Sequence, residues 1–179
     1  MNILAICGSL RKKSTNMGLL RFAQANAPEG SSITIADLSA LPFYNADLGE
    51  KPAAVVSLLE QIGAADALIF GCPEYNYSIA PALKNALDWA SREPENALLS
   101  GKAVALMGAG GGMGTSRAQY HLRQVCVFLN LHPLNKPEVF ANAFTSAFDG
   151  DGNLVDEKIQ GTIKTQLVAL VAWATQLKK

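Results

Sequence analysis

The feature that most restricts the fold of this chain is a regular alternation of wholly apolar segments with segments of helical periodicity. Three apolar segments, Ile3–Cys7, Ala67–Cys72 and Ala103–Met107, contain no polar side chain, which is typical of strands buried on both faces. A short β-branched segment at Ser32–Ala36 and a weaker one at about Lys136–Phe140 complete the set of expected strands.

Segments with helical periodicity separate these strands. The expected helices cover Met17–Ala27, Ala53–Ala64, Pro81–Ala90, Ser116–Leu129 and Glu157–Leu177. Buried strands that are joined by helices form a parallel sheet with helices on both faces, and right-handed crossovers leave few strand orders. We therefore expect a doubly wound, flavodoxin-like α/β sheet with strand order 2-1-3-4-5, formed by residues 1–179 as a single domain.

Composition restricts the class of protein. The chain has 15 Lys plus Arg and 15 Asp plus Glu, so no overall field favours nucleic acid or a membrane surface. Its three cysteines lie far apart, as expected for buried, reduced thiols in a cytoplasmic protein rather than for disulfides or a metal site. Met1 leads directly into the first strand, so we expect no signal peptide, and the apolar stretch Leu167–Ala174 is too short to span a bilayer.

The nine residues Gly8–Asn16 connect the first strand to the first helix. They contain three hydroxyl side chains, one amide and three cations, and no acidic residue occurs before Glu29. Gly8 permits a sharp exit from the strand, and Ser14 or Thr15 can cap the helix. A helix N-terminus with free N–H groups, hydroxyls and an arginine is typical of a phosphate site. A basic surface turn with an ordinary cap is the alternative.

Two further loops follow expected strands and open onto the same edge of the sheet, where doubly wound folds bind ligands. Pro73–Ser78 places tyrosines on both sides of Asn76, which suits the faces and the polar edge of a flat heterocycle. A surface turn with two partly buried tyrosines is the alternative. Gly108–Thr115 lacks side chains at several positions, so a planar ligand can approach its backbone, although it matches neither the Walker A nor the Gly-x-Gly-x-x-Gly pattern.

The sequence indicates no metal site and no catalytic side chain. His121 and His132 have no second ligand at metal spacing. The segment Asp149–Asn153 lacks the length and the closing glutamate of a calcium loop, so we expect a polar turn there. Neither a nucleophile with its base nor a dedicated acid is evident, as expected if a cofactor carries the chemistry.

Three motifs occur in order along the chain: Gly8-Ser9-Leu10-Arg11-Lys12-Lys13-Ser14-Thr15-Asn16, then Pro73-Glu74-Tyr75-Asn76-Tyr77-Ser78, then Leu83-Lys84-Asn85-Ala86-Leu87-Asp88-Trp89. Together they resemble the NADPH-dependent FMN reductase family, which includes quinone and chromate reductases, and the resemblance covers nearly the whole chain. It implies FMN bound without a covalent bond, NADPH or NADH as electron donor, and a homodimer or homotetramer with FMN near the subunit interface.

The resemblance also implies roles for individual residues. The phosphate contacts would come from Ser9, Arg11, Ser14 and Asn16, and the lining of the isoalloxazine from Pro73, Glu74, Tyr75, Asn76 and Tyr77. Further cofactor contacts are expected from Leu10, Thr15, Gly108, Gly110 and Gly111. Relatives often carry Ser-Pro where this chain has Gly110-Gly111. The missing hydroxyl is expected to loosen or retune the flavin.

The expected function is transfer of electrons from NAD(P)H through FMN to a small acceptor, such as a quinone, a flavin, an azo compound or chromate. The sequence does not select the acceptor or the nicotinamide donor. An electron-transfer flavodoxin without NAD(P)H oxidation is the main alternative, but such carriers tend to be acidic, and this chain has no net charge. A nucleotide-binding regulator would require the tyrosine loop to be accidental.

The helix at Ser116–Leu129 favours association between subunits. Clusters of apolar and aromatic surface residues beside a cofactor cleft commonly mark interfaces, and the segment Leu41–Asn45 offers another such cluster. We expect Val125, Phe128 and Leu129 to face the core and Arg117, Tyr120, His121 and Gln124 to be exposed, with Arg117 and Tyr120 contacting the partner subunit and Glu138 as an ionic partner.

Overall fold

The structure, a computed structural model, describes residues 1–178, apart from the side chain of Glu95. Strands and helices alternate along the chain in the predicted order. The elements are β1 (Asn2–Cys7), α1 (Thr15–Ala25), β2 (Ser32–Ala36), α2 (Ala53–Ala64), β3 (Ala67–Gly71), β4 (Glu74–Tyr75), β5 (Ser78–Ile79), α3 (Pro81–Ala90), the short 3-10 helix η1 (Pro94–Asn96), β6 (Ala103–Gly110), α4 (Ser116–Phe128), β7 (His132–Pro133), β8 (Val139–Asn142) and α5 (Glu157–Leu177).

The central sheet is parallel and has the order β2-β1-β3-β6-β7, with β8 also paired to β6. The doubly wound order predicted from the sequence is therefore confirmed. The fifth strand, expected at about Lys136–Phe140, is instead divided in two. His132 pairs with Ala103 at the beginning of β6, and Val139 pairs with Met107 near its end.

The segment between β7 and β8 leaves the sheet for a local reason. The Leu134 N–H still donates to the Val104 carbonyl at 2.8 Å, but Pro137 has no N–H group to donate to the ladder. The Arg123 guanidinium from α4 donates to the Leu134 carbonyl at 3.1 Å and to Asn135 Oδ1 at 3.3 Å. The Leu134 carbonyl is therefore paired with the Arg123 side chain of α4.

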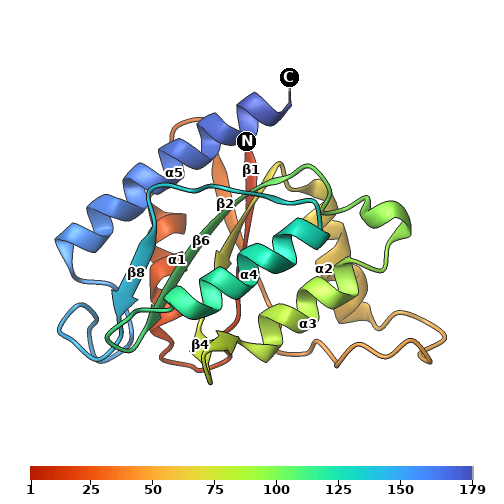
Figure 1. Ribbon diagram of the computed structural model, residues 1–179, viewed down its shortest axis with the longest axis horizontal. Helices are drawn as coiled ribbons and strands as arrows, with labels where there is room; N and C mark the ends of the chain where they lie inside the picture. Colours follow the sequence, from red (N-terminus) through yellow and green to blue (C-terminus); the bar gives the residue numbers. More distant parts are fainter. Residues whose placement is uncertain (179) are drawn as a thin grey trace.

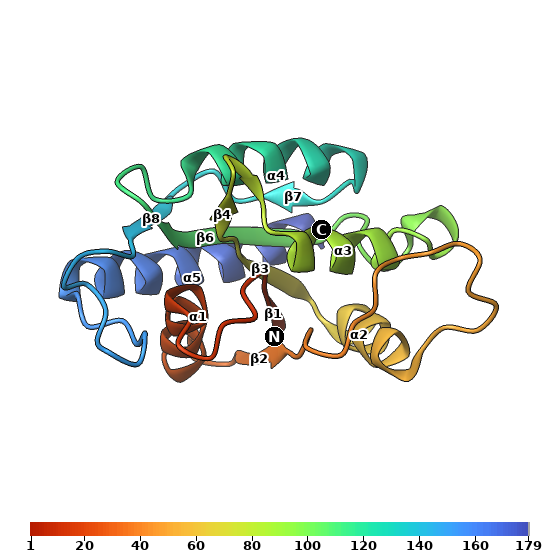
Figure 2. The same ribbon diagram turned by 90° about the horizontal axis from the view of Figure 1, so that it is seen from below.

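Side chains alternate between two apolar layers along each central strand. In β1, Leu4 and Ile6 pack with α2, α3 and α4, whereas Ile3, Ala5 and Cys7 pack with α1 and α5. Figures 1 and 2 show these two sets of helices on opposite faces of the sheet. Burial on both faces explains why the central strands are apolar throughout. Among residues 1–178, none of the helices has the length and apolar character needed to cross a bilayer.

Helix α1 begins earlier than predicted. It covers Thr15–Ala25 rather than Met17–Ala27, because Ser14 Oγ accepts the Met17 N–H at 3.1 Å and the helix follows this cap at once. At the other end, Asn26 Nδ2 donates to the Phe22 carbonyl at 2.9 Å and ends the helix.

Other boundaries differ at the carboxyl ends of strands. β3 ends at Gly71, one residue before the predicted Cys72, and β6 continues to Gly110 rather than ending at Met107. β6 is longer because β8 pairs with its last four residues. Helix α4 ends at Phe128, and Phe128 is 77% exposed, so the prediction that it faces the core is wrong.

The polar turn before α5 is confirmed and packs against α1. Asp149 Oδ1 accepts the N–H groups of Asp151 and Asn153 at 2.9 and 2.8 Å, which closes the turn. Gly18 of α1 lies directly under this turn: a Cβ atom at Gly18 would be 1.9 Å from the Gly152 carbonyl oxygen. This contact requires glycine in the middle of a helix, where glycine is otherwise unfavourable.

We expect Gly18→Ala to destabilise the fold by about 1–3 kcal/mol because the added methyl group overpacks this contact. Gly161→Ala is the matched control, since Gly161 also lies inside a helix but a Cβ atom added there would have no neighbouring atom within 4 Å. It should stabilise the fold by about 0.5–1 kcal/mol through helix propensity. Urea unfolding of both variants measures the difference, and equal stabilities would contradict the proposed close contact.

Candidate functional site

Three loops leave the sheet side by side at the carboxyl ends of β1, β3 and β6. The Gly8 N–H donates to the Gly71 carbonyl at 2.8 Å, and the Cys72 N–H donates to the Met107 carbonyl at 2.8 Å. These bonds continue the strand register just beyond β1 and β3. Figure 1 shows the three loops along the lower edge of the molecule, near β4. The sheet therefore brings the predicted loops together.

The loop after β1 offers a row of backbone donors. In the part of the chain that the structure describes, the N–H groups of residues 12–16 have no acceptor. Several of them belong to the N-terminal end of α1, where the helix dipole favours an anion. Arg11 and Lys12 are exposed beside them, whereas Lys13 pairs with Asp151 at 2.9 Å. This arrangement fits the phosphate of FMN.

The other predicted cofactor contacts of this loop have different settings. Ser9 and Ser14 are buried, and Leu10 is exposed at the rim. The Ser14 hydroxyl is already the cap of α1. Thr15 is partly exposed and belongs to the first turn of α1. The two serine side chains are therefore buried, and the unpaired N–H groups are the donors that the loop still offers.

Asn16 differs from the role that the motif implies. Its Nδ2 donates to the Ala109 carbonyl at 2.8 Å, and its Oδ1 accepts the Ala109 N–H at 2.9 Å. Both ends of the amide are therefore used within the chain, and the side chain is 5% exposed. The amide fastens the loop after β1 to the end of β6, so only the backbone N–H of Asn16 is free to face a phosphate.

A pocket of about 290 Å³ lies beside this loop. Part of its wall is not predicted from the sequence: Asp37, Leu38 and Ser39 line the pocket from the segment after β2. The predicted strand order could have indicated these residues, because it places β2 beside β1 and so makes the segments after the two strands neighbours.

The loop after β3 is a tight hairpin. β4 and β5 pair antiparallel, and the two residues that connect them, Asn76 and Tyr77, have φ angles of 50° and 64°. Two successive left-handed residues are typical of a type I′ turn, and such a conformation is strained for a tyrosine. Pro73 is buried, whereas Tyr75, Asn76 and Tyr77 are exposed. The turn is confirmed, and its side chains are available to a ligand.

Glu74 does not present its side chain as the resemblance implies. Its Oε2 accepts the N–H groups of Arg117 and Ala118, each at 3.1 Å, and its Oε1 accepts from Arg117 Nη1 at 2.7 Å. The carboxylate therefore caps α4 from another element. Within the chain, Arg117 pairs with Glu74 and lies 3.9 Å from the centre of the Tyr77 ring, and its expected contact with a partner subunit stays a prediction.

The glycines at the end of β6 and just after it have two different settings. A Cβ at Gly108 would be 2.0 Å from Thr115 Oγ1, and one at Gly110 would be 2.3 Å from the Gly114 carbonyl oxygen. These two residues belong to β6, not to a loop, and packing within the chain already requires them to be glycine. Gly111 and Gly112 have no atom within 4 Å of a Cβ position. Only these two leave space for a planar ligand to approach.

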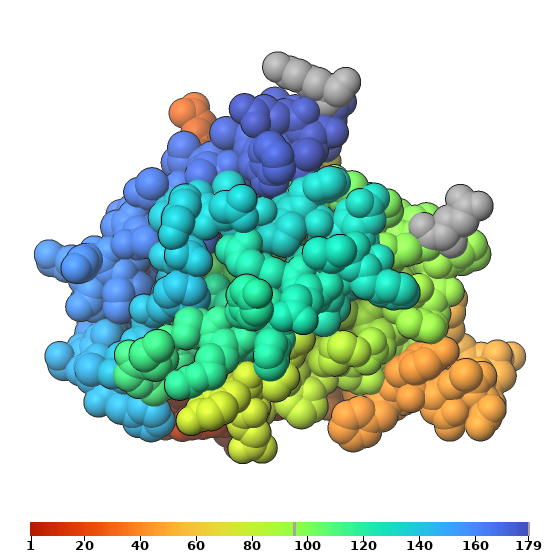
Figure 3. Space-filling view, viewed as in Figure 1, coloured from red at the N-terminus to blue at the C-terminus, as the bar shows by residue number. Residues whose placement is uncertain are grey.

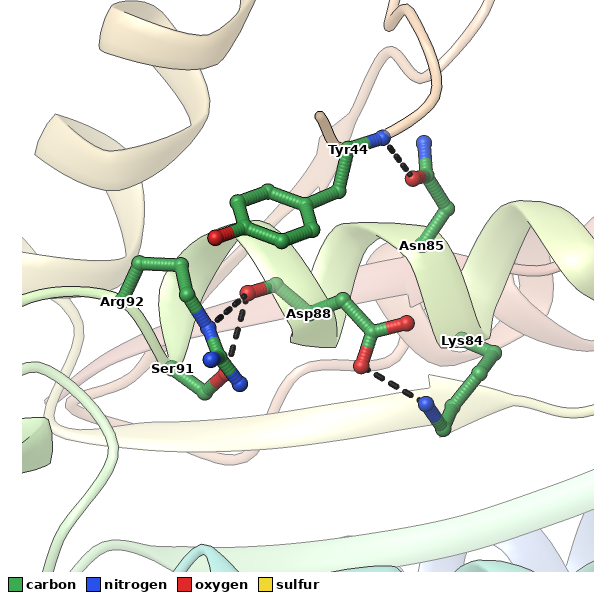
Figure 4. Close-up of polar contacts among 6 residues, drawn as sticks. All are labelled: Tyr44, Lys84, Asn85, Asp88, Ser91 and Arg92. Atoms are coloured by element: carbon green, nitrogen blue, oxygen red, sulfur yellow. Dashed lines mark hydrogen bonds and ion pairs between the residues drawn. The ribbon is translucent and has the colours of Figure 1, made fainter. Parts of the chain in front are cut away.

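The third motif, on α3, holds the segment after β2. Asn85 Oδ1 accepts the Tyr44 N–H at 2.8 Å (Figure 4), and Asn85 Nδ2 donates to the Pro42 carbonyl at 2.9 Å. Trp89 Nε1 donates to the same carbonyl at 2.8 Å, and its ring contacts Tyr44 edge to face. Figure 4 also shows the Arg92 side chain near the Tyr44 ring and the Lys84–Asp88 pair on the same helix. The motif therefore has a positioning role.

The described residues offer little acid–base chemistry. Cys7, Cys72 and Cys126 are buried and unpaired, as predicted. Burial raises the pKa of Cys72 and of Cys126 to about 12, so these thiols stay protonated at neutral pH. Within residues 1–178, no three His, Cys, Asp or Glu side chains are grouped as a metal site requires. His121 is exposed, with Nδ1 3.2 Å from Ser78 Oγ.

Comparisons with known proteins agree with this geometry. The NADPH-dependent FMN reductase family matches residues 1–146. The chain belongs to this family. It is 51% identical to an NAD(P)H-dependent FMN reductase of Pseudomonas aeruginosa (99% of this chain and 97% of that protein) and 48% identical to a probable NADPH:quinone oxidoreductase of Oryza sativa (100% and 94%).

Solved structures extend the agreement to the fold. A flavoenzyme NAD(P)H:acceptor oxidoreductase from Paracoccus denitrificans superposes with a TM-score of 0.87 at 30% identity, over 98% of this chain and 97% of that one. The family predicted from the three motifs is confirmed. The protein is an NAD(P)H-dependent flavin-linked oxidoreductase, with FMN and a nicotinamide as its cofactors.

We expect Arg11→Ala to weaken FMN binding by about 1.5–3 kcal/mol, or about 10- to 100-fold in Kd, because a charge-assisted contact to the phosphate is lost. Fluorescence titration of the apoprotein with FMN measures this. Lys178→Ala is the control: it removes a cation that pairs with Asp66, just before β3 and at the opposite edge of the sheet. Equal losses in both variants would mean that general charge, not the loop, binds the phosphate.

Proposed function

We propose that this protein oxidises NAD(P)H and delivers the electrons to small quinones through FMN held at the carboxyl edge of its sheet. The row of unpaired N–H groups at residues 12–16, beside the exposed Arg11, is the observation that carries the proposal. The two carboxylates beside the loop are already engaged, because Asp151 pairs with Lys13 and Asp37 accepts the Ser39 N–H, so Arg11 is left to face a phosphate. Relatives from rice, potato and Escherichia coli that bear quinone reductase names support the acceptor class.

Each loop has a distinct task in this proposal. Bound FMN supplies the redox chemistry. The N–H groups of residues 12–16 and Arg11 hold its phosphate, and Asn16 fixes the distance between that loop and the end of β6. The hairpin at Tyr75–Tyr77 borders the ring, while the bare backbone of Gly111 and Gly112 leaves room for it. The ring face remains open for the nicotinamide and then for the acceptor.

The open face is consistent with several acceptors, and no described group would bind only one of them. Several relatives are named for a quinone and the Pseudomonas aeruginosa relative is named for FMN, so we place a quinone first, a flavin second, and an azo compound or chromate after them. An electron carrier without NAD(P)H oxidation is disfavoured by the zero net charge and by the reductase names of the relatives.

We also propose that residues 1–179 act as one domain, because both helical layers cover the same sheet. We propose that the protein works in the cytoplasm, where its three unpaired thiols would remain reduced.

Steady-state assays test the function. The FMN-loaded protein should consume NADPH or NADH in the presence of benzoquinone, with flavin, azo dye and chromate tested in parallel at equal concentration. Each nicotinamide is used separately, so that the donor preference is measured. The Arg11→Ala variant, supplied with limiting FMN, should lose rate in proportion to its lost cofactor. FMN binding without NAD(P)H oxidation would instead identify an electron carrier.

We propose further that the active form is a homodimer or homotetramer with FMN near the interface. Helix α4 lies on the face shown in Figure 3, and its exposed apolar residues Tyr120, Val127 and Phe128 are 68%, 80% and 77% exposed. A groove of about 570 Å³ runs between α3 and α4 beside them. Clustered apolar exposure of this kind is typical of association surfaces.

Light scattering should give two or four times the 19.0 kDa chain mass. The double variant Val127→Glu with Phe128→Glu should shift the mass to that of one chain, because charges are costly in an apolar interface. Val168→Glu is the control, since Val168 is an exposed valine on α5, on the other face of the sheet. A fully active wild-type monomer would contradict the proposed assembly.

A further inference from the structure

We propose that Glu74 is a positioning residue, which fastens the β4–β5 hairpin to α4 and balances positive charge beside the flavin ring. The inference rests on the proposed function in one respect: the hairpin is taken to border the ring. The motif alone implied that the Glu74 side chain lines the flavin. Its contacts instead place its carboxylate between the hairpin and the first turn of α4.

Helix α4 has no side-chain cap at its own N-cap position. Thr115, at the N-cap position, makes no capping hydrogen bond with its side chain, because it is buried under Gly108 and accepts from Gln119 Nε2 at 3.0 Å. The N–H groups of Arg117 and Ala118 would otherwise lack a partner at the helix N-terminus. Glu74 Oε2 accepts both at 3.1 Å. A carboxylate 43 residues earlier in the chain thus supplies the missing cap.

The turn that follows Glu74 and Tyr75 has a strained backbone. Asn76 and Tyr77 both have positive φ angles, and neither is glycine, so the surrounding structure must hold this conformation. Arg117 provides the connection. Its guanidinium donates to Glu74 Oε1 at 2.7 Å and lies 3.9 Å from the Tyr77 ring centre. One arginine therefore contacts the residue before the turn and a residue within it.

The Glu74 carboxylate carries a negative charge in a largely buried position. The Glu74 side chain is 9% exposed, while that of Arg117 is 40% exposed. The carboxylate faces both a guanidinium and the positive end of α4, so it cancels positive charge on the α4 side of the hairpin. Removal of its charge leaves that positive charge unopposed. Positive charge near a redox cofactor favours its reduced form, so the midpoint potential of bound FMN should become more positive.

Three variants separate these effects. Glu74→Gln keeps the shape and one N–H acceptor but removes the charge, and Glu74→Ala removes the acceptor as well. Arg117→Met leaves both helix N–H groups capped by Glu74 but removes the ion pair and the contact with Tyr77. Glu93→Gln is the control, because Glu93 also pairs with a cation, Lys51, and its side chain is 23% exposed.

Amide hydrogen exchange of the apoprotein tests the positioning without any cofactor. Residues 74–79 should exchange at least about tenfold faster in Glu74→Ala and in Arg117→Met, with Glu74→Gln between them and wild type, whereas Glu93→Gln should match wild type. If Glu74→Ala does not fold, Glu74→Gln and Arg117→Met still decide the result. Wild-type exchange at residues 74–79 in both would overturn the positioning role.

Redox titration of the FMN-loaded variants tests the charge. We expect the midpoint potential to shift to more positive values in Glu74→Gln and to more negative values in Arg117→Met, with no shift in Glu93→Gln. Shifts of the same sign, or none, would overturn the electrostatic part of the inference. If FMN fails to bind the wild-type protein, the proposed function is wrong, whereas the exchange experiment still decides whether Glu74 positions the hairpin.

Discussion

The hydrogen bonds from Gly8 N–H to Gly71 O and from Cys72 N–H to Met107 O determine where three loops leave the sheet. They continue the parallel register one residue beyond the strands, so the loops start at adjacent points. Side chains have little room there: a Cβ at Gly8 would lie 2.9 Å from Pro73 Cδ and 3.1 Å from Ala80 Cβ. The loop after β1 and the hairpin can be neighbours only because residue 8 is glycine.

Two helices that begin at this edge are capped in different ways. α1 is capped by Ser14, the residue directly before it, and the N–H groups of Thr15 and Asn16 at its beginning have no acceptor among the described residues. α4 is capped by Glu74, which belongs to the hairpin. The first arrangement leaves a helix N-terminus free to attract an anion, and the second neutralises one. The site therefore has its strongest positive character at the loop after β1, where a phosphate would bind.

Much of the fold could be predicted because it depends on local patterns. Apolar strands buried on both faces, and helices between them, lead directly to the order of the sheet. Pro137 is visible in the sequence, but the division of the fifth strand also depends on a contact between Arg123 and Leu134 across separate elements, which local patterns do not reveal. The same limit applies to the site. The motifs identified loops that the structure brings to one edge of the sheet, but the contacts of the Asn16 and Glu74 side chains depend on partners 93 and 43 residues away.

The contact between Gly18 and the turn at Asp149–Asn153 has a consequence for the smallest piece of chain that can fold. The family match ends at residue 146, yet the turn and α5 lie beyond it and cover α1 and one face of the sheet. Arg21 of α1 also donates to Asn153 Oδ1 at 2.7 Å. A fragment that ended with the family match would expose an apolar layer and lose its support beneath the first loop. The region that defines the family is therefore shorter than the unit that must fold together to hold the loop after β1 in place.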